Sequence, residues 1–311
     1  MPELPEVQTT VSGLKKTVVG LVIQDAWTDL AKKSVSRPDY RDTIKYLPFF
    51  EQFRKSVRGA KIVSAERRAK NILINLDSGH TILIHMKMTG HVMYGAYAHD
   101  TKHNVWTPAK TETNDALRDP FNRFLHFVLT FTNGKQLVLS DVRKFAKVTL
   151  LSTAEAHTTK HLDGLGPEPL EKEFDARAFV VRLSKKPKGK IKTVLMDQSL
   201  ISGIGNIYSD EALWLAGIHP ESVVAKIPDA KQKELYTAVR TVLEKGIDFG
   251  GDSTSDYRRI DGTRGEFSAE HNAYRLAGTP CKKPKCKGAI LRKVVGGRSA
   301  HFCPVHQKLF K

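Results

Sequence analysis

The chain has 311 residues, of which 40% are hydrophobic and 27% are charged, a composition typical of folded globular proteins. No apolar run approaches the roughly 18 residues of a membrane span, and the start lacks a basic region followed by an apolar core, so neither a membrane protein nor a signal peptide is expected. The 50 Lys and Arg residues outnumber 33 acids and give a net charge of +17, which favours a polyanionic partner such as nucleic acid.

The first element expected is an amphipathic helix at the start of the chain. Apolar residues recur there at spacings of three and four, which predicts one buried helical face. A proline in the segment suits the first turn of a helix. The residues concerned are Leu4, Val7, Val11, Leu14 and Val18, with Pro5 in the first turn.

Strands are expected next. Residues 71–76 alternate Ile and Leu with Asn and turn into residues 81–86. Residues 125–131 and 136–142 flank an Asn-Gly turn and form a second hairpin. The polar segment 95–120 shows no period and is predicted to be a long surface loop. The first half is therefore a helix plus an antiparallel β-rich domain.

The period changes to that of helices near residue 150. A Gly- and Pro-rich stretch at 162–170 indicates a link between two halves, and the glycine-rich segment 250–266 is predicted to be a mobile loop. The expected domains are residues 1–150, 151–265 and 266–311. The predicted helices cover residues 174–183, 192–198, 206–217 and 230–247.

All three cysteines lie in the last 31 residues, and an odd number argues against a disulfide framework. Cys281, Cys286, Cys303 and His306 form a Cys-x4-Cys-x16-Cys-x2-His pattern, which provides the three thiolates and one imidazole of a closed zinc tetrahedron. Metal binding would fold a segment with so little core of its own. The alternative is three free cysteines in a basic tail.

The positive charge is concentrated in three stretches. Residues 54–70 hold seven basic residues and one acid, residues 182–192 hold six and no acid, and residues 281–311 hold nine and no acid. Such stretches can follow a phosphate backbone along one groove. They can equally be three separate solvated faces, and charge alone does not decide between these interpretations.

Several motifs, in chain order, resemble those of the formamidopyrimidine-DNA glycosylases, within the wider group that includes endonuclease VIII. They are MPELPEV (1–7), ERRAKNILINL (66–76), HMKMTGH (85–91), DVRKFA (141–146), LDGLGPEPL (162–170), MDQSLISGIGNIYSDEALWLAGIHP (196–220) and RSAHFCPVHQ (298–307). The resemblance covers nearly the whole chain. Leu4 stands where the pyrimidine-lesion branch usually has glycine.

The resemblance implies an α+β fold. An N-terminal helix and an antiparallel β-sandwich would form the catalytic domain, followed by a helical domain with a helix–two-turn–helix and a zinc-finger β-hairpin. It implies base excision repair of damaged double-stranded DNA by a bifunctional glycosylase and abasic-site lyase. One structural Zn²⁺ per chain, a monomer and a cytoplasmic, nucleoid-associated location are expected, with no membrane partner.

The resemblance also assigns catalytic residues. Removal of Met1 would leave Pro2 with a free secondary amine, and a terminal amine has a pKa near 8, so a useful fraction is neutral and nucleophilic. Glu3 is expected to act as general acid and base, and Glu6 to orient the amine. Lys70 and Arg298 are expected to contact phosphate and assist elimination. As simple first-turn acids, Glu3 and Glu6 would only complement the helix dipole.

The remaining assignments concern DNA binding. An everted base leaves a hole in the stack, and the resemblance gives its filling to Met88, Arg143 and Phe145. Without it, Met88 and Phe145 would be interpreted as core residues. Contacts to the DNA backbone are assigned to Lys188, Lys192 and Asn206.

The sequence departs from the family pattern at Val142, where proline is usual, at Lys87, where glycine is common, and at Phe124, where a histidine is often found. Two other functions stay open at this point. One is an endonuclease VIII-like glycosylase for oxidised pyrimidines, and the other is a non-catalytic zinc-ribbon DNA-binding protein. A tautomerase that uses Pro2 as its base would need neither the finger nor the basic surface.

Overall fold

The computed structural model describes residues 1–156 and 158–311, and the chain forms two compact units. The first consists of Met1–Asp163 and Gly250–Glu266, and the second of Gly164–Phe249 and Phe267–Lys311. The expected boundaries at residues 150 and 265 therefore differ from this division. The difference arises because the segment 250–266 packs on the first unit, although the helices on either side of it in the sequence belong to the second.

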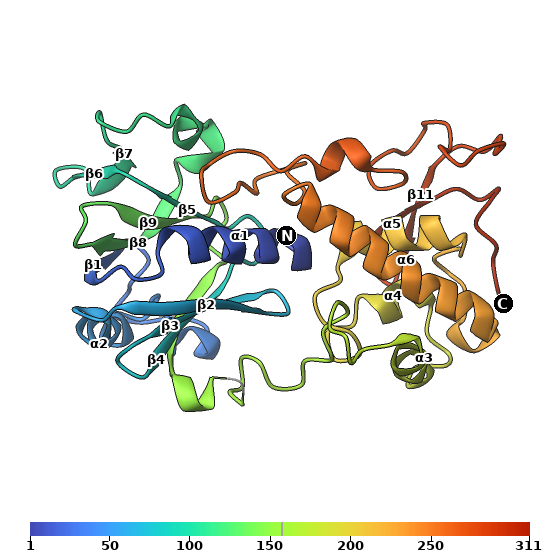
Figure 1. The fold of residues 1–311 in the computed structure, drawn as a ribbon, viewed down its shortest axis with the longest axis horizontal. Helices are drawn as coiled ribbons and strands as arrows, with labels where there is room; N and C mark the ends of the chain where they lie inside the picture. Colours follow the sequence, from blue (N-terminus) through green and yellow to red (C-terminus); the bar gives the residue numbers. More distant parts are fainter. Residues whose placement is uncertain (157) are drawn as a thin grey trace. The chain divides into compact units, whose positions relative to one another are not determined.

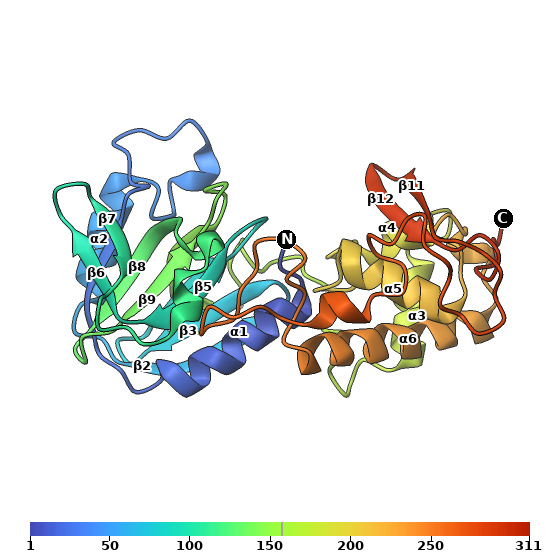
Figure 2. The same cartoon turned by 90° about the horizontal axis from the view of Figure 1, so that it is seen from above.

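The first unit is built on two four-stranded antiparallel sheets (Figures 1 and 2). Alternate residues of both sheets point into one shared core, which makes the pair a β-sandwich, as expected. One sheet has the order β1(Ile23–Thr28), β8(Leu125–Phe131), β9(Gln136–Ser140), β5(His91–Gly95), and the other has the order β10(Lys147–Ser152), β4(His80–His85), β3(Asn71–Leu76), β2(Ile62–Arg68).

Two helices complete this core, α1(Leu4–Thr17) and α2(Leu47–Val57). The five apolar residues predicted to form the buried face of the first helix are at most 1% exposed, so that prediction is confirmed. Both predicted hairpins are also confirmed, with β3 paired to β4 and β8 paired to β9. Gly134 of the Asn-Gly turn has φ 80°, a left-handed conformation that favours glycine.

The prediction of a long surface loop at 95–120 is wrong. The segment contains an antiparallel hairpin of β6(Tyr97–Asp100) and β7(Val105–Pro108), followed by two short 3₁₀ turns. The segment is mostly polar, but a few of its apolar residues pack on the outer face of the β1–β8–β9–β5 sheet. Tyr97 and Leu117 are buried there, and the rings of Trp106 and Trp27 lie 6.2 Å apart.

The second unit is mainly helical and also contains a two-stranded hairpin close to the C-terminus (Figure 1). Each predicted helix is present, with ends shifted by up to three residues. The elements are α3(Ala176–Ser184), α4(Ile191–Leu195), α5(Asn206–Ala216), α6(Asp229–Asp248), β11(Leu291–Val295) and β12(Arg298–Phe302). Among the described residues, no helix combines the length and apolar character needed to cross a membrane.

Candidate active site and metal centre

The start of the chain is built into the N-terminus of α1. Glu3 caps the helix through a reciprocal pair of hydrogen bonds: its carboxylate accepts from the Glu6 amide, and its own amide donates to Oε2 of Glu6 at 2.7 Å. Pro2 immediately precedes this cap and is buried, whereas Met1 is 43% exposed. The positive end of the helix dipole therefore lies next to the Pro2 nitrogen, which disfavours a positive charge on an amine at that position.

Glu6 is held from a second side by the segment 250–266. Its Oε1 accepts a hydrogen bond from the Asp252 amide at 2.8 Å, and its carbonyl accepts one from the Tyr257 hydroxyl at 3.1 Å. A Cβ added at Gly251, whose φ is 86°, would lie 3.0 Å from the Glu6 Cγ. Only glycine suits this approach of the loop to α1.

The segment 250–266 is irregular, as expected for a loop, and two of its side chains are anchored in the first unit. Tyr257 is 4% exposed and Arg258 is fully buried. The Arg258 guanidinium donates to the Ser255 and Tyr257 carbonyls at 2.9 Å and contacts the Asp119 carboxylate at 3.3 Å. A buried cation needs such partners, so these contacts fix the loop to the first unit.

We expect Glu6→Gln to destabilise the first unit. The two carboxylate oxygens accept from two different backbone amides, and an amide side chain offers only one oxygen, so one N–H would face an NH₂ group. An unsatisfied buried donor costs about 1–3 kcal/mol. The midpoint of urea unfolding should fall by the urea concentration that corresponds to this loss of free energy. Glu51→Gln, on the exposed face of α2, should leave the midpoint unchanged. Equal midpoints for the two variants would contradict the positioning role of Glu6.

Lys70 lies in the tight connection between β2 and β3 and is only 5% exposed. The preceding Ala69 has φ 53°, a left-handed conformation that alanine adopts only under constraint, and its carbonyl accepts from the Arg67 guanidinium at 3.1 Å. Burial, together with Lys87 and Lys70, lowers the pKa of His85 to about 3. The imidazole beside this lysine is therefore neutral at pH 7.

The three residues that are expected to fill the gap left in the DNA base stack by an everted nucleotide lie on two loops of the first unit. Met88 follows β4 and is 40% exposed, and Phe145 precedes β10 and is 42% exposed, so neither is a core residue. The Arg143 guanidinium carbon lies 4.5 Å from the centre of the Phe145 ring. Met88 and Phe145 also line one cavity of about 300 Å³, together with Met1 and Tyr40.

The loop that carries Arg143 and Phe145 is shaped by a buried carboxylate. Asp141 is 1% exposed and accepts from the amides of Arg143 at 3.2 Å and Ala146 at 2.7 Å. Lys144, between Arg143 and Phe145, has φ 56°. The buried Asp141 carboxylate therefore fixes the backbone of this loop, while its side chains are exposed. A rigid loop of this kind suits residues that insert into a base stack.

Lys87, the departure in front of Met88, also has a left-handed backbone, with φ 55°. A side chain costs roughly 1–2 kcal/mol in this conformation, and glycine avoids that penalty. Both Lys87→Gly and Lys87→Ala remove the charge, but only Lys87→Ala keeps the Cβ. We therefore expect Lys87→Gly to be the more stable variant, with a higher unfolding temperature and an unfolding free energy larger by about 1 kcal/mol. A calorimetric comparison of the two variants measures this difference, and a more stable alanine variant would contradict it.

In the second unit, the structure corrects the expectation for Lys192. Its side chain is fully buried, and its Nζ forms an ion pair with the equally buried Asp210 at 2.5 Å. Nζ also lies 3.3 Å from the Ser209 hydroxyl. A buried, paired lysine has no surface to offer a DNA phosphate, so Lys192 is a structural residue. Lys188, by contrast, is exposed.

Asn206 and Arg298 lie at ends of secondary-structure elements in the second unit. Asn206 is the first residue of α5, and its Oδ1 has no hydrogen-bond partner among the described residues. Arg298 begins β12 and is exposed, directly after Gly296 and Gly297, which have φ 56° and 75°. The two glycines make the tight turn of the β11–β12 hairpin, directly before Arg298.

Two acidic residues of α5 were not identified from the sequence. Asp210 accepts from the His301 amide at 2.9 Å in addition to Lys192. Glu211 accepts from the amides of Asn272, Ala273 and Tyr274 at 2.8–2.9 Å. They join α5 to the hairpin and to the segment that precedes it. The only signal in the sequence is a pair of adjacent acids in an otherwise apolar helix.

The four predicted metal ligands come together. One donor atom from each of Cys281, Cys286, Cys303 and His306 lies within 4.8 Å of the others. Nδ1 of His306 is 3.2 Å from Sγ of Cys281, and Sγ of Cys286 is 3.6 Å from Sγ of Cys303. The set of three thiols and one imidazole fits a tetrahedral ion, so these residues could hold a metal.

The surroundings of the cluster fix its geometry. Nε2 of His306 lies 2.9 Å from the Trp214 carbonyl, which can only accept, so the ring proton is on Nε2 and Nδ1 presents a lone pair to the cluster. A Cβ added at Gly288 would lie 2.6 Å from Sγ of Cys303. The site therefore requires glycine at this position.

The chain combines a β-sandwich with a helical unit that carries a cluster of four potential metal ligands. This combination is the architecture of helix–two-turn–helix proteins that have a zinc-finger hairpin. Residues 1–148 match the formamidopyrimidine-DNA glycosylase N-terminal domain, and residues 165–258 match the H2TH domain of the same glycosylases. The chain belongs to the formamidopyrimidine-DNA glycosylase family.

Relatives with that name match over their full length. The protein of Heliobacterium modesticaldum is 36% identical over 99% of this chain and 100% of its own, and that of Chloroflexus aurantiacus is 38% identical over 99% and 98%. Among solved structures, Lactococcus lactis Fpg with abasic-site DNA has a TM-score of 0.80 and 31% identity, covering 98% of this chain and 99% of its own. The same wild-type protein with DNA that contains N7-benzyl-Fapy-dG has a TM-score of 0.80 and 30% identity, covering 99% of this chain and 100% of that one.

Proposed function

We propose that this protein is a bifunctional DNA glycosylase and abasic-site lyase that removes oxidised purines, 8-oxoguanine and formamidopyrimidines, from duplex DNA in base excision repair. The observation that carries the proposal is Pro2 at the positive end of α1, directly before a cap made by two buried carboxylates, in a member of this family. The cytoplasmic, nucleoid-associated location and the monomer belong to the same proposal.

The chemistry starts from an unblocked amine. While Met1 is attached, the Pro2 nitrogen is a tertiary amide and is not nucleophilic. After removal of Met1 it is a secondary amine, which attacks C1′ of the damaged nucleotide as the C1′–base bond breaks. The nitrogen then loses its proton, and its lone pair forms a double bond to C1′ as the C1′–O4′ bond breaks and O4′ takes up a proton. The sugar ring is thereby opened to an iminium ion, which keeps its positive charge because the nitrogen carries no further proton to lose. Loss of a C2′ proton then expels the 3′ phosphate, and a second elimination expels the 5′ phosphate.

The surrounding residues have distinct parts in this proposal. Glu3 donates a proton to the opening sugar ring, and Glu6 acts as a positioning residue through its hydrogen bond to the Glu3 amide. Lys70 supplies a cation for base release and elimination. Met88, Arg143 and Phe145 fill the space left by the everted nucleotide, with the guanidinium bonded to the orphaned cytosine. Asn206, Lys188 and Arg298 bind phosphate.

We also propose that the metal of the Cys281, Cys286, Cys303 and His306 cluster is one structural Zn²⁺. Three thiolates and an imidazole are donors that zinc prefers, and no fifth group is needed to close the tetrahedron. The ion would hold the hairpin β11–β12 that carries Arg298, and it takes no part in the chemistry.

Borohydride trapping tests the enzymatic proposal. A duplex with 8-oxoguanine opposite cytosine is incubated with the protein and sodium borohydride, which reduces an iminium to a stable amine. A covalent protein–DNA band is expected. Its absence, in a preparation that binds the same duplex, would support a non-catalytic zinc-ribbon DNA-binding protein instead.

One comparison favours a wider substrate range. A solved structure of Lactococcus lactis Fpg, with a TM-score of 0.79 and 30% identity, is a complex with an oxidised pyrimidine containing DNA. The endonuclease VIII-like specificity is therefore tested in the same trapping assay, with an oxidised pyrimidine in place of 8-oxoguanine. We expect a stronger band with 8-oxoguanine.

A further inference from the structure

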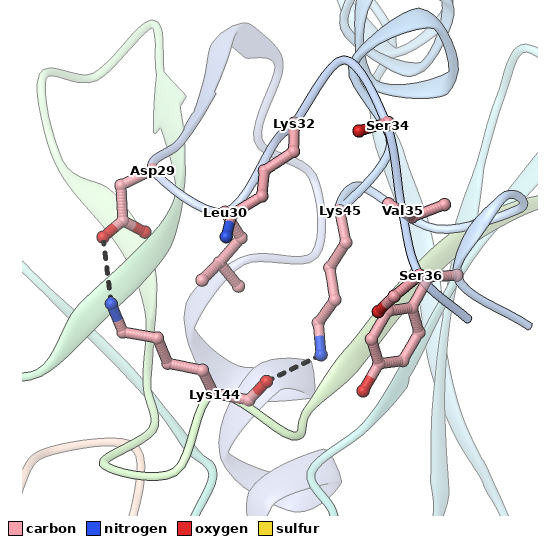
Figure 3. Close-up of a pocket in the computed structure, with 9 residues that line it drawn as sticks. Asp29, Leu30, Lys32, Ser34, Val35, Ser36, Lys45 and Lys144 are labelled. Atoms are coloured by element: carbon pink, nitrogen blue, oxygen red, sulfur yellow. Dashed lines mark hydrogen bonds and ion pairs between the residues drawn. The ribbon is translucent and has the colours of Figure 1, made fainter.

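A basic cavity of about 490 Å³ lies in the first unit, with Lys144 in its lining (Figure 3). Lys144 stands between Arg143 and Phe145 in the chain. One wall is the segment from Asp29 to Lys45, between β1 and α2, and the other is Lys144. The lining includes three lysines but only one acid, along with hydroxyl groups. The residues are Asp29, Leu30, Lys32, Ser34, Val35, Ser36, Tyr40, Lys45 and Lys144.

Lys45 provides the main evidence that this cavity binds a ligand. It is 6% exposed, yet among the described residues its Nζ donates only to the Lys144 carbonyl, at 2.7 Å, and lies 4.3 Å from the centre of the Tyr40 ring. An ammonium group has three donors, so this buried cation lacks a hydrogen-bonded anion. Burial accordingly lowers the pKa of Lys45 to about 8.

The other charged groups leave the cavity positive. Lys32 is exposed, and its ammonium group has no partner among the described residues and points into the cavity (Figure 3). Asp29, the one acid of the lining, already has partners: its carboxylate lies 2.9 Å from Nδ1 of His126 and 4.0 Å from Nζ of Lys144, which also lines the cavity. Outside the lining, Asp39 lies between Lys147, at 2.6 Å, and Arg37, at 2.9 Å, and does not bond Lys45.

We propose that this cavity binds a backbone phosphate of DNA. Two ammonium groups and the hydroxyls of Ser34, Ser36 and Tyr40 are donors that suit phosphate oxygens. The site is joined to the loop that carries Arg143 and Phe145, because Lys45 bonds the carbonyl of Lys144 between them. This inference rests on the proposed function for its DNA ligand. A free phosphate ion or a nucleotide offers the same phosphate oxygens as DNA. The second arm of the test distinguishes these small ligands from DNA.

The first arm measures the salt dependence of binding to a duplex with a tetrahydrofuran abasic analogue, which has no base to release. Removal of one phosphate interaction reduces the slope of log K against log salt by about 0.9. Lys32→Ala and Lys45→Met are expected to show that reduction. Lys33→Ala is the matched control, since Lys33 is an exposed lysine next to Lys32 but outside the lining.

Unchanged slopes in Lys32→Ala and Lys45→Met would overturn the proposal, and so would an equal reduction in Lys33→Ala. Because the abasic analogue forms no iminium, this arm gives the same answer even if the Pro2 chemistry fails. Lys32 is exposed, so its variant stays informative if Lys45→Met does not fold.

The second arm titrates inorganic phosphate and a mononucleotide into the intact protein and follows the NMR signals of the cavity lysines. We expect no saturable binding with a Kd of about 1 mM or below, the range that would mark a dedicated site for a small anion. Tight phosphate binding that Lys45→Met abolishes, with a normal DNA slope, would overturn the DNA assignment in favour of a free anion.

Discussion

Pro2→Leu is expected to abolish base excision and covalent trapping. A large second residue prevents removal of Met1, so the free amine moves by one residue, about 3.5 Å along the chain. Pro2 is buried directly before the α1 cap, so the displaced amine cannot take its place. A misplacement of even about 1 Å costs about 10²-fold in rate, and loss of the nucleophile costs more. Single-turnover excision of 8-oxoguanine measures the effect.

The matched variant is Pro2→Gly. Glycine permits removal of Met1 and keeps an amine at the same position, but it is a primary amine on a more flexible residue. We therefore expect slower excision with a detectable trapped band. If Pro2→Leu, with Met1 retained, excised the lesion at the rate of the unaltered protein, Pro2 would not be the nucleophile.

The second large effect is expected at the metal cluster. His306→Ala removes one of four donors and should weaken metal binding by at least about 10²-fold, more than the removal of a supporting hydrogen bond does. The apolar cluster around the site is small, with Trp214, Ile290 and Cys303 among its members, so a bound metal would supply much of the stability of this part of the chain. The hairpin that presents Arg298 should then lose its structure.

Elemental analysis and duplex affinity measure these two consequences. We expect about one Zn²⁺ per unaltered chain, none in dialysed His306→Ala, and weaker DNA binding by that variant. His103→Ala is the control, since His103 is an exposed histidine on the β6–β7 turn, outside the cluster. Full zinc content and full affinity in His306→Ala would contradict the assignment of this residue as a ligand.

Periodicity predicts the first helix, two of the hairpins and the helices of the second unit, but not α2 or the remaining strands of the sandwich. The alternation of Ile72, Ile74 and Leu76 and the spacing along α1 identify buried faces, because burial imposes the period of the local structure. The same reasoning fails at 95–120, where the hairpin is anchored by isolated residues such as Tyr97 and Trp106. Scattered anchors in a polar segment leave no period to detect.

The candidate site depends on pairings that are distant in the sequence. Lys192 resembles a surface lysine in a basic stretch, and only the fold brings Asp210, 18 positions away, within 2.5 Å. Glu6 and Asp252 are 246 positions apart. The metal ligands were predictable because their chemistry and spacing are specific, whereas no local pattern marks such partners.

The most direct measurement locates the covalent bond itself. The borohydride-reduced complex with 8-oxoguanine DNA is digested with nuclease and protease, and the modified peptide is sequenced by mass spectrometry. We expect a peptide that begins at Pro2 and carries the reduced sugar on its terminal nitrogen. An adduct on the Lys70 side chain, or an active protein whose first residue is Met1, would contradict the assignment of Pro2 as the nucleophile.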